Sequence, residues 1–354
     1  MVKTLNGIRT LLFLFIFGAH FKYVILYSEL GRNLFHFFDI GRFAILCFFL
    51  LSGFCIALGY SDKFKNISKQ SYLNFVIKRF VRIYPLYLLT GIVGLLFIFL
   101  PQGIKWLHLF LFVYVPMLTP WLGINAGGNV AGWFVCAIFF CYLIAPIFLV
   151  WFNQNNNLKF HIIFSFVNYL ILTVFSIYLM LINVPNNEFF FRFPVIRLFE
   201  YFVALDVGFI FVKFLKGKLD FKIFNNYFYK SLIDVLYAAV FILIMYVLPN
   251  NLLYRHVIAI PVVCSFFVYM CIEKRSFLYD IFTSKLFDFG GNISYECYMI
   301  HLLLFNFMTE FSKKYLSALT DIVFLYLILL LLTVIISIVY NQTVMLIKKY
   351  VIKS

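Results

Sequence analysis

The chain has 354 residues, of which 64% are hydrophobic, 22% aromatic and 12% charged, and its mean hydropathy is +0.99. A soluble domain is about 45–50% apolar and about 25% charged, so this composition excludes a soluble enzyme, a disordered scaffold and a small disulfide-stabilised secreted domain. The 29 Lys and Arg outnumber the 14 Asp and Glu. Because cations gather in the cytoplasmic loops of membrane proteins, we attribute this excess to membrane topology and not to nucleic-acid binding.

Apolar stretches of roughly 17–25 residues, separated by polar or Pro, Gly and Asn clusters, predict ten transmembrane helices. They lie near residues 8–27, 40–60, 83–101, 131–151, 160–182, 194–214, 228–248, 255–273, 291–311 and 321–346. The apolar segment 104–119 is shorter and favours an interfacial or re-entrant piece. We therefore predict an all-α, polytopic helical bundle, in which residues 1–354 form a single membrane-embedded domain with no appended soluble domain.

The distribution of cations predicts the orientation of this bundle. Ten spans place both termini on the same side of the membrane. If that side is the cytoplasm, most of the 29 Lys and Arg face inward, including those at 63–82 and 213–230, as the positive-inside rule requires. His36 and the 183–193 loop then face outward.

Arg9 and His20 are ionisable residues of the first span, where each costs on the order of 2.5–3.5 kcal/mol and is a functional candidate for that reason. His20 follows Arg9 by 11 residues, a spacing that places both on one helix face, about 16 Å apart. The face carries a cation near the cytoplasmic end and an imidazole toward the external half. The alternative is a snorkelling arginine and a core histidine bound to a carbonyl group, and these two residues alone do not distinguish the two interpretations.

A second candidate is the cationic group Lys78, Arg79 and Arg82, just before Pro85. Their helical spacing places the three cations on one face of a helix at the cytoplasmic interface. Such a face binds either anionic lipid headgroups or the phosphates of a cofactor docked at the mouth of the bundle.

Carboxylates inside the spans are the third group. Glu200 is three residues from Arg197, and Asp39 is three residues from Arg42, so each carboxylate has a neighbour that neutralises it. Both pairs lie at the depth of His20, and either carboxylate is a candidate to orient its ring. Asp206, Asp234 and Glu296 are further carboxylates in spans.

The remaining histidines and the cysteines carry weaker signals. His301 lies about ten residues into the ninth span and is the other deep imidazole, whereas His36, His108, His161 and His256 fall near span boundaries, where we interpret them as interfacial residues. The seven cysteines lie in apolar stretches without a CxxC motif. They predict neither disulfides nor a metal site.

Five short motifs follow one another along the chain. They are Arg9 and His20; GRFAILCFFLLSGF from Gly41 to Phe54; Arg79, Arg82, Ile83, Pro85 and Tyr87; Arg197, Glu200, Tyr201 and Phe202; and GGNISYECYMIH, with Gly291, Ser294, Tyr295, Tyr298 and His301. Together they resemble the acyltransferase-3 family of bacterial membrane O-acyltransferases over nearly the whole chain. The stretch WFVCAIFFCYLIAP from Trp133 departs from the glutamate-bearing branch, because Ile138 stands where that glutamate aligns, and it is similar to another branch.

This resemblance implies an enzyme of the bacterial inner membrane that takes an acyl group from acyl-CoA, usually acetyl-CoA. It implies a hydroxyl acceptor on a surface polysaccharide or a lipid-linked saccharide. His20 is then the general base or the acyl carrier, with Glu200 or Asp39 as its orienting carboxylate. Arg9 binds donor phosphate or stabilises developing charge, and Lys78, Arg79 and Arg82 bind the donor's phosphates.

A transporter or flippase for lipid-linked oligosaccharide is the alternative, since a bundle of many spans with buried charge also fits that function. The two differ in one requirement, because only the enzyme needs a donor site. The identity of the acceptor, the acyl chain and the oligomeric state do not follow from the sequence.

Overall fold

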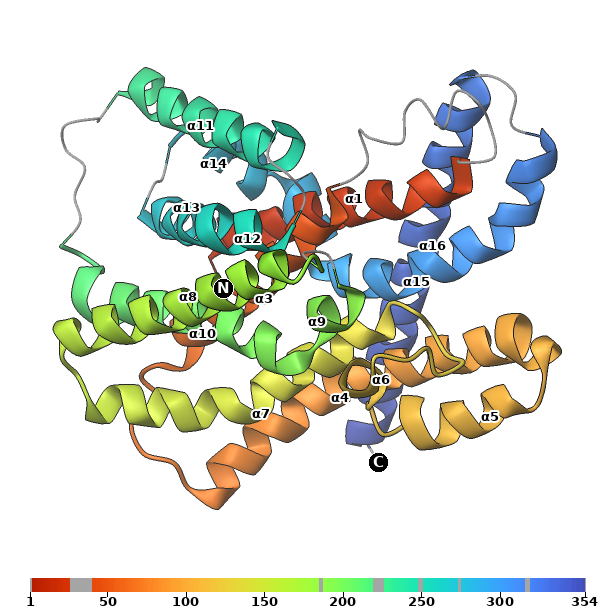
Figure 1. Cartoon of the computed structure of the whole chain (residues 1–354), viewed down its shortest axis with the longest axis horizontal. Helices are drawn as coiled ribbons and strands as arrows, with labels where there is room; N and C mark the ends of the chain where they lie inside the picture. Colours follow the sequence, from red (N-terminus) through yellow and green to blue (C-terminus); the bar gives the residue numbers. More distant parts are fainter. Residues whose placement is uncertain are drawn as a thin grey trace.

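The computed structural model of the chain describes residues 2–25, 40–184, 187–218, 226–247, 251–272, 275–315 and 319–353. Within these ranges the backbone consists of helices and short connections, without a strand (Figure 1). This confirms the prediction of an all-α fold. The long helices are α1 (Lys3–Ile25), α3 (Gly41–Tyr60), α4 (Lys69–Gly94), α7 (Gly132–Gln154), α8 (Leu158–Leu181), α10 (Pro194–Ile210), α11 (Tyr227–Ile242), α13 (Ile260–Ile272), α15 (Lys285–Tyr315) and α16 (Leu319–Lys353).

The sequence predicts ten spans. Among the described residues, eight helical segments are long and apolar enough to cross a membrane. The other two predicted spans, 194–214 and 291–311, are helical as α10 and as part of α15, but both helices carry several charged residues. Most side chains of α10 are buried. A helix enclosed by its neighbours can hold charged groups at membrane depth because protein partners replace water.

The cationic stretch and the third predicted span form one helix. Ser68 begins α4 with a capping box, in which its hydroxyl accepts from the backbone N–H of Ser71 and the Ser71 hydroxyl accepts in return. The helix continues past Gly94 through a π-helical turn to Gln102. Arg79 and Arg82 therefore lie about three turns inside a continuous helix and not on a separate interfacial one.

Segment 104–119 is a short arm that turns back along α4. It comprises α5 (Lys105–Leu109) and the π-helical η4 (Phe110–Tyr114). The Tyr114 ring stacks on that of Tyr87 with centroids 4.3 Å apart, and the Tyr87 hydroxyl donates to the Tyr114 carbonyl at 2.6 Å. These contacts join the arm to the bundle, in keeping with the expected re-entrant piece.

Two ion pairs join helix ends that are predicted to lie on the same side of the membrane. Lys213 pairs with Asp62 at 2.7 Å, and both lie in segments predicted to be cytoplasmic. Arg42 pairs with Glu188, and both lie toward the predicted external side. The 61–68 and 155–157 connections both lie at the left of Figure 1, as alternating spans require. The assignment of that side to the cytoplasm stays a prediction.

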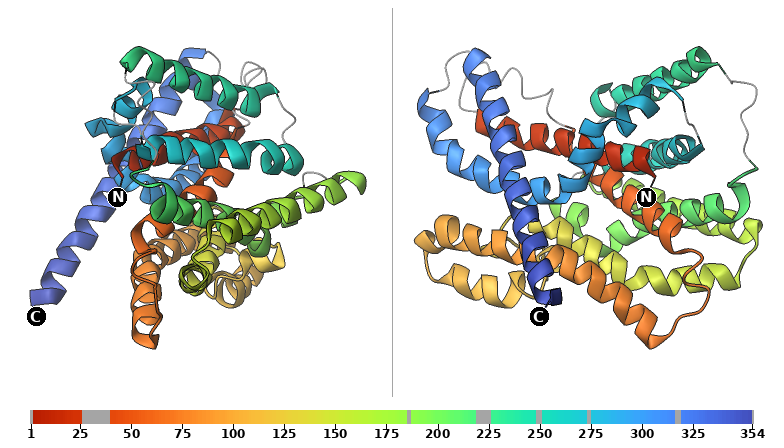
Figure 2. Two further views of the ribbon diagram at one scale, coloured as in Figure 1. Left: turned by 90° about the vertical axis from the view of Figure 1, so that its left-hand side faces the viewer. Right: turned by 180° about the vertical axis from the view of Figure 1, so that it is seen from behind.

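Small residues bring two pairs of helices into close contact. A Cβ added at Gly291 of α15 would lie 2.1 Å from the carbonyl oxygen of Asn6 in α1, and one at Gly53 of α3 would lie 2.4 Å from that of Tyr201 in α10. Glycine permits this approach because it lacks the side chain that would separate the backbones. α16 crosses the back of the bundle as a long, largely exposed helix (Figure 2).

Candidate active site

A cavity of about 120 Å³, the arginine cavity, opens between α1, α3, α4, α7 and α15. Its cations are Arg9 from α1 and Arg79 and Arg82 from α4, and Ser294 and Tyr295 line it from α15. Arg9 thus joins the two arginines that the sequence assigned to phosphate binding. Lys78 is exposed and does not line the cavity, because adjacent helix positions point about 100° apart.

Aromatic side chains hold the cavity wall in place. The guanidinium carbon of Arg79 lies 5.2–5.5 Å from three ring centroids, which belong to Phe75, Tyr60 and Tyr142. The Tyr295 hydroxyl donates to the Ile83 carbonyl at 2.5 Å and so ties α15 to α4. The arginine cavity is therefore a fixed, cationic recess with an aromatic wall.

A second and larger cavity of about 740 Å³, the histidine cavity, lies further along α1. His20 and Lys22 line it from α1, and Glu188 and Arg192 line it from the short helix α9 (Glu188–Arg192). Glu188 accepts from Arg192 at 3.2 Å and also pairs with Arg42. Lys22, Glu188 and Arg192 were not singled out from the sequence. The i, i+4 pair of opposite charge in the 183–193 loop was the signal available.

His20 contacts His301 across the interface of α1 and α15. Nδ1 of His20 lies 2.8 Å from Nε2 of His301, and the ring planes stack with centroids 5.0 Å apart. The His20 ring is half-buried at the cavity, whereas His301 is fully buried. Phe13 and Phe17 of α1 also pack against the His301 ring.

Tyr298 lines both cavities. Its hydroxyl donates to the Ala131 carbonyl at 3.1 Å, and its ring packs against Phe134. The arginine cavity and the cavity that holds His20 therefore share the buried side chain of Tyr298 as part of their walls. The sequence placed Tyr298 in a motif but gave no position for it relative to the cavities.

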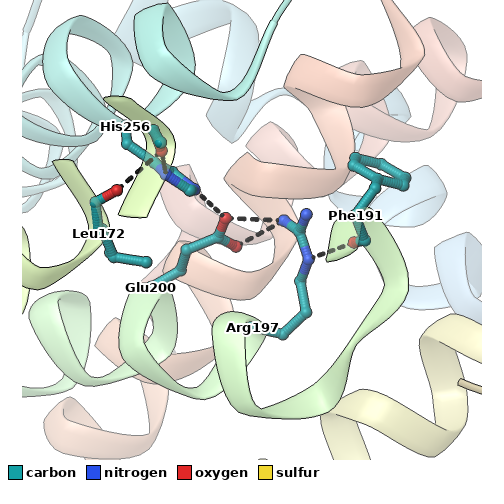
Figure 3. Close-up of polar contacts among 6 residues, drawn as sticks. Leu172, Phe191, Arg197, Glu200 and His256 are labelled. Atoms are coloured by element: carbon teal, nitrogen blue, oxygen red, sulfur yellow. Dashed lines mark hydrogen bonds and ion pairs between the residues drawn. The ribbon is translucent and has the colours of Figure 1, made fainter. Parts of the chain in front are cut away.

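Glu200 lies in a different polar cluster (Figure 3). It accepts from Arg197 at 2.6 and 2.8 Å, and Nε2 of His256 lies 2.8 Å from its Oε1. Nδ1 of His256 in turn contacts the Ser176 hydroxyl at 2.6 Å. Orientation of His20 by Glu200 is not supported by this geometry, because the partner of the His20 ring is His301. The other candidate for that role, Asp39, lies outside the described residues.

The Glu200 cluster reaches the histidine cavity indirectly. Arg197 donates from Nε to the carbonyl of Phe191 at 2.7 Å, and its guanidinium covers the Phe191 ring at 4.6 Å. Phe191 belongs to α9 and lines the histidine cavity. Glu200 therefore holds the arginine that fixes one wall of this cavity.

Two histidines expected at the interface are buried in helix contacts. His256 is fully buried in the Glu200 cluster, and His161 is fully buried against Asp206, with Nδ1 and Oδ1 2.5 Å apart. Ser165 donates to the other oxygen of Asp206 at 2.6 Å. Neither histidine is an exposed boundary residue, because carboxylates of α10 offer both of them partners inside the bundle; their depth in the membrane stays a prediction.

Comparisons with known proteins agree with the motifs. The family model for an acyltransferase domain, acyltransferase-3, matches residues 2–341. Acyltransferase MdmB of Streptomyces mycarofaciens is 32% identical over 160 residues, which are 41% of this chain and 38% of that protein. The alignment thus covers well under half of the relative's length. No solved structure matches the chain.

Proposed function

The chain belongs to the acyltransferase-3 family of membrane acyltransferases, and on this premise we propose that it transfers an acetyl group from acetyl-CoA to a hydroxyl of a cell-surface glycan or lipid-linked saccharide. The observation that carries the proposal is the pair of cavities on α1, one with three arginines and one with His20, which share Tyr298 as a lining residue. A donor site and a base site are what acyl transfer needs.

The arginine cavity suits the donor. Guanidinium groups bind phosphate oxygens through paired, charge-assisted hydrogen bonds. The cavity volume of about 120 Å³ is below the roughly 300 Å³ of a small-molecule pocket, so the nucleotide remains toward the mouth while the narrow pantetheine arm extends inward. The thioester then arrives at Tyr298, which also lines the cavity of His20.

The histidine cavity suits the acceptor. His20 removes the proton of the acceptor hydroxyl as the oxygen attacks the thioester carbonyl, the carbon–sulfur bond breaks, and the proton passes to the departing thiolate of CoA. Lys22 and Arg192 line the same cavity and stabilise negative charge on the carbonyl oxygen during attack. Trp133 adds an aromatic face against which a sugar ring can pack.

The predicted topology gives this chemistry a direction across the bacterial inner membrane. The arginine cavity lies nearer the predicted cytoplasmic side, where acetyl-CoA is found, and the histidine cavity nearer the external side, where α9 lies. In this proposal the donor enters from the cytoplasm and the acceptor from outside. No metal ion is required, because His20 and the cations supply the acid–base and electrostatic contributions.

Purified full-length protein in lipid nanodiscs tests the proposal. With acetyl-CoA and a total extract of lipid-linked saccharides, we expect release of free CoA thiol and a saccharide heavier by one acetyl group in mass spectrometry. Arg82→Ala should lower turnover at subsaturating acetyl-CoA, with Lys78→Ala as the matched control. A protein that moves labelled saccharide across a vesicle bilayer without consuming acetyl-CoA would overturn the proposal in favour of a transporter.

A further inference from the structure

The hydrogen-bond partners of His301 fix where its protons lie. Nδ1 of His301 is 2.7 Å from the carbonyl oxygen of Tyr298 and 3.2 Å from that of Cys297. Carbonyl oxygens only accept hydrogen bonds, so Nδ1 must carry a proton. In a neutral His301 ring, Nε2 is then unprotonated and can only accept.

This constraint passes to His20. Because Nε2 of His301 accepts, Nδ1 of His20, 2.8 Å away, must donate. A neutral His20 therefore has its lone pair on Nε2. With one proton on each ring, this arrangement satisfies the contact between His20 and His301 and the two contacts of His301 with carbonyl oxygens.

The surroundings favour the neutral pair. In the part of the chain that the structure describes, neither imidazole has a carboxylate partner, and Nε2 of His20 has no hydrogen-bond partner. Four charged side chains line the cavity beside His20. Lys22, Arg42 and Arg192 are cationic, and the one anion, Glu188, is paired with Arg42 and Arg192. A positive charge on either imidazole ring in the resting protein would be disfavoured by the burial of the rings and by these cations.

We propose that His301 is the positioning residue of the site, a neutral imidazole that holds His20 in the tautomer whose Nε2 faces the acceptor and that shares the proton His20 takes up. The inference rests on the proposed function, since it needs His20 to be the base. In many hydrolases a buried carboxylate has this role; here a second histidine, anchored to its own helix backbone, takes its place.

The proton balance of the step is simple. As Nε2 of His20 takes the acceptor's proton, Nδ1–H of His20 moves toward or onto Nε2 of His301. The positive charge then faces the carbonyl oxygens of Tyr298 and Cys297, whose dipoles stabilise it. When the thiolate leaves, the proton returns through His20 to the sulfur, and both rings regain their starting form.

Two substitutions at one position separate this role from packing. His301→Leu removes the acceptor while keeping an apolar side chain, and His301→Gln keeps a carbonyl oxygen near the place of Nε2. We expect kcat to fall by about 10²-fold or more in the leucine variant, with the KM for acetyl-CoA unchanged. The glutamine variant should recover about tenfold of this loss, the value of one hydrogen bond.

Histidine tautomers are also measurable directly, which keeps the test valid if a variant folds poorly. The chain has six histidines, so ¹⁵N-histidine NMR of the full-length protein in nanodiscs, compared with His20→Ala, assigns the His20 signals. We expect a protonated Nδ1 and an unprotonated Nε2. His20 protonated at Nε2 in the resting protein would overturn the inference.

The kinetic outcomes distinguish the two proposals. If His20→Ala turns over acetyl-CoA at the wild-type rate, the proposed function of His20 is wrong. If His20→Ala is inactive while His301→Leu keeps the wild-type kcat, the base assignment holds and only the role of His301 is wrong. Equal activity of the leucine and glutamine variants would likewise contradict the hydrogen-bond role.

Discussion

Two kinds of buried ionisable cluster occur in this bundle. The Glu200 cluster and the Asp206 cluster lie between helices and surround their carboxylates with arginine, histidine and serine donors. The His20–His301 pair also joins two helices, but Nε2 of His20 has no hydrogen-bond partner among the described residues and the ring borders a cavity of about 740 Å³. Buried titratable groups of this chain therefore occur in two different surroundings.

The difference shows why depth alone does not identify a catalytic residue. A carboxylate whose acceptor sites are filled by protein donors gains fixed position but has no capacity left for a substrate. An imidazole that is hydrogen-bonded through one nitrogen has a fixed position, and its other nitrogen remains able to bind a substrate. Nε2 of His161 also has no hydrogen-bond partner among the described residues, but it is buried and lines neither cavity, and both nitrogens of His256 are hydrogen-bonded. The cavity beside the ring, and not the cost of burial, therefore separates His20 from His161 and His256.

His20→Ala should have the largest effect on the rate of acyl transfer. A general base contributes about 10² to 10⁴-fold to the rate, and removal of one half-buried ring should leave the bundle folded. We expect acyl transfer, measured by CoA thiol release, to fall by that factor at a normal protein level in the membrane. Near wild-type transfer by this variant would contradict the assignment.

Glu200→Ala should show the opposite pattern, with stability lost first. The substitution leaves the fully buried Arg197 and His256 without their carboxylate, and breaking a buried ion pair costs about 3–5 kcal/mol. We expect a lower melting temperature and less protein in the membrane. His108→Ala, at an exposed position, is the control for loss of a polar side chain.

The kcat of the folded Glu200→Ala fraction should remain much closer to wild type than that of His20→Ala. A Glu200→Ala protein of normal stability and no activity would instead place Glu200 in the catalytic machinery.

Arg82→Ala should have an effect of intermediate size, and this effect should be on the binding of acetyl-CoA. A hydrogen bond to a charged group contributes about 1.5–3 kcal/mol, so we expect the KM for acetyl-CoA to rise by about tenfold or more with little change in kcat. Lys78→Ala, four positions earlier on α4 but outside the cavity, should leave both constants unchanged. Equal effects of the two substitutions would indicate binding of lipid headgroups along the helix.

Asp62→Asn should have the smallest effect. The hydrogen bond from Lys213 holds the pKa of the Asp62 carboxyl below its usual range. A lowered pKa in the folded state means that the ionised carboxylate stabilises the fold above its unfolded pKa of about 3.9 and loses this contribution as the pH falls through the folded value. Because the Asp62 side chain is 70% exposed, we expect about 0–1 kcal/mol.

Melting temperatures of wild type and Asp62→Asn, measured from neutral pH downward, check this small term. The two curves should differ slightly at neutral pH and converge at acidic pH. A difference that grows with acidity would contradict the pairing of Asp62 with Lys213.

Much of the protein follows from local sequence. Span length and composition predict an all-α membrane bundle because hydropathy is a property of each segment alone. The spacing of Arg9 and His20, and the helix that carries Arg79 and Arg82, follow from helix periodicity. The resemblance of these motifs to the acyltransferase-3 family was confirmed by the match over residues 2–341.

The partners of the buried groups needed the tertiary structure. Glu200 and Asp39 were equally good candidates beside His20 in sequence, yet His20 contacts His301, and Glu200 contacts His256. Residues at one depth in different spans are equivalent until helix neighbours are known. Those neighbours are set by the close approach of backbones at positions such as Gly291 against Asn6 and Gly53 against Tyr201, because packing between helices, and not hydropathy along them, selects which side chains meet.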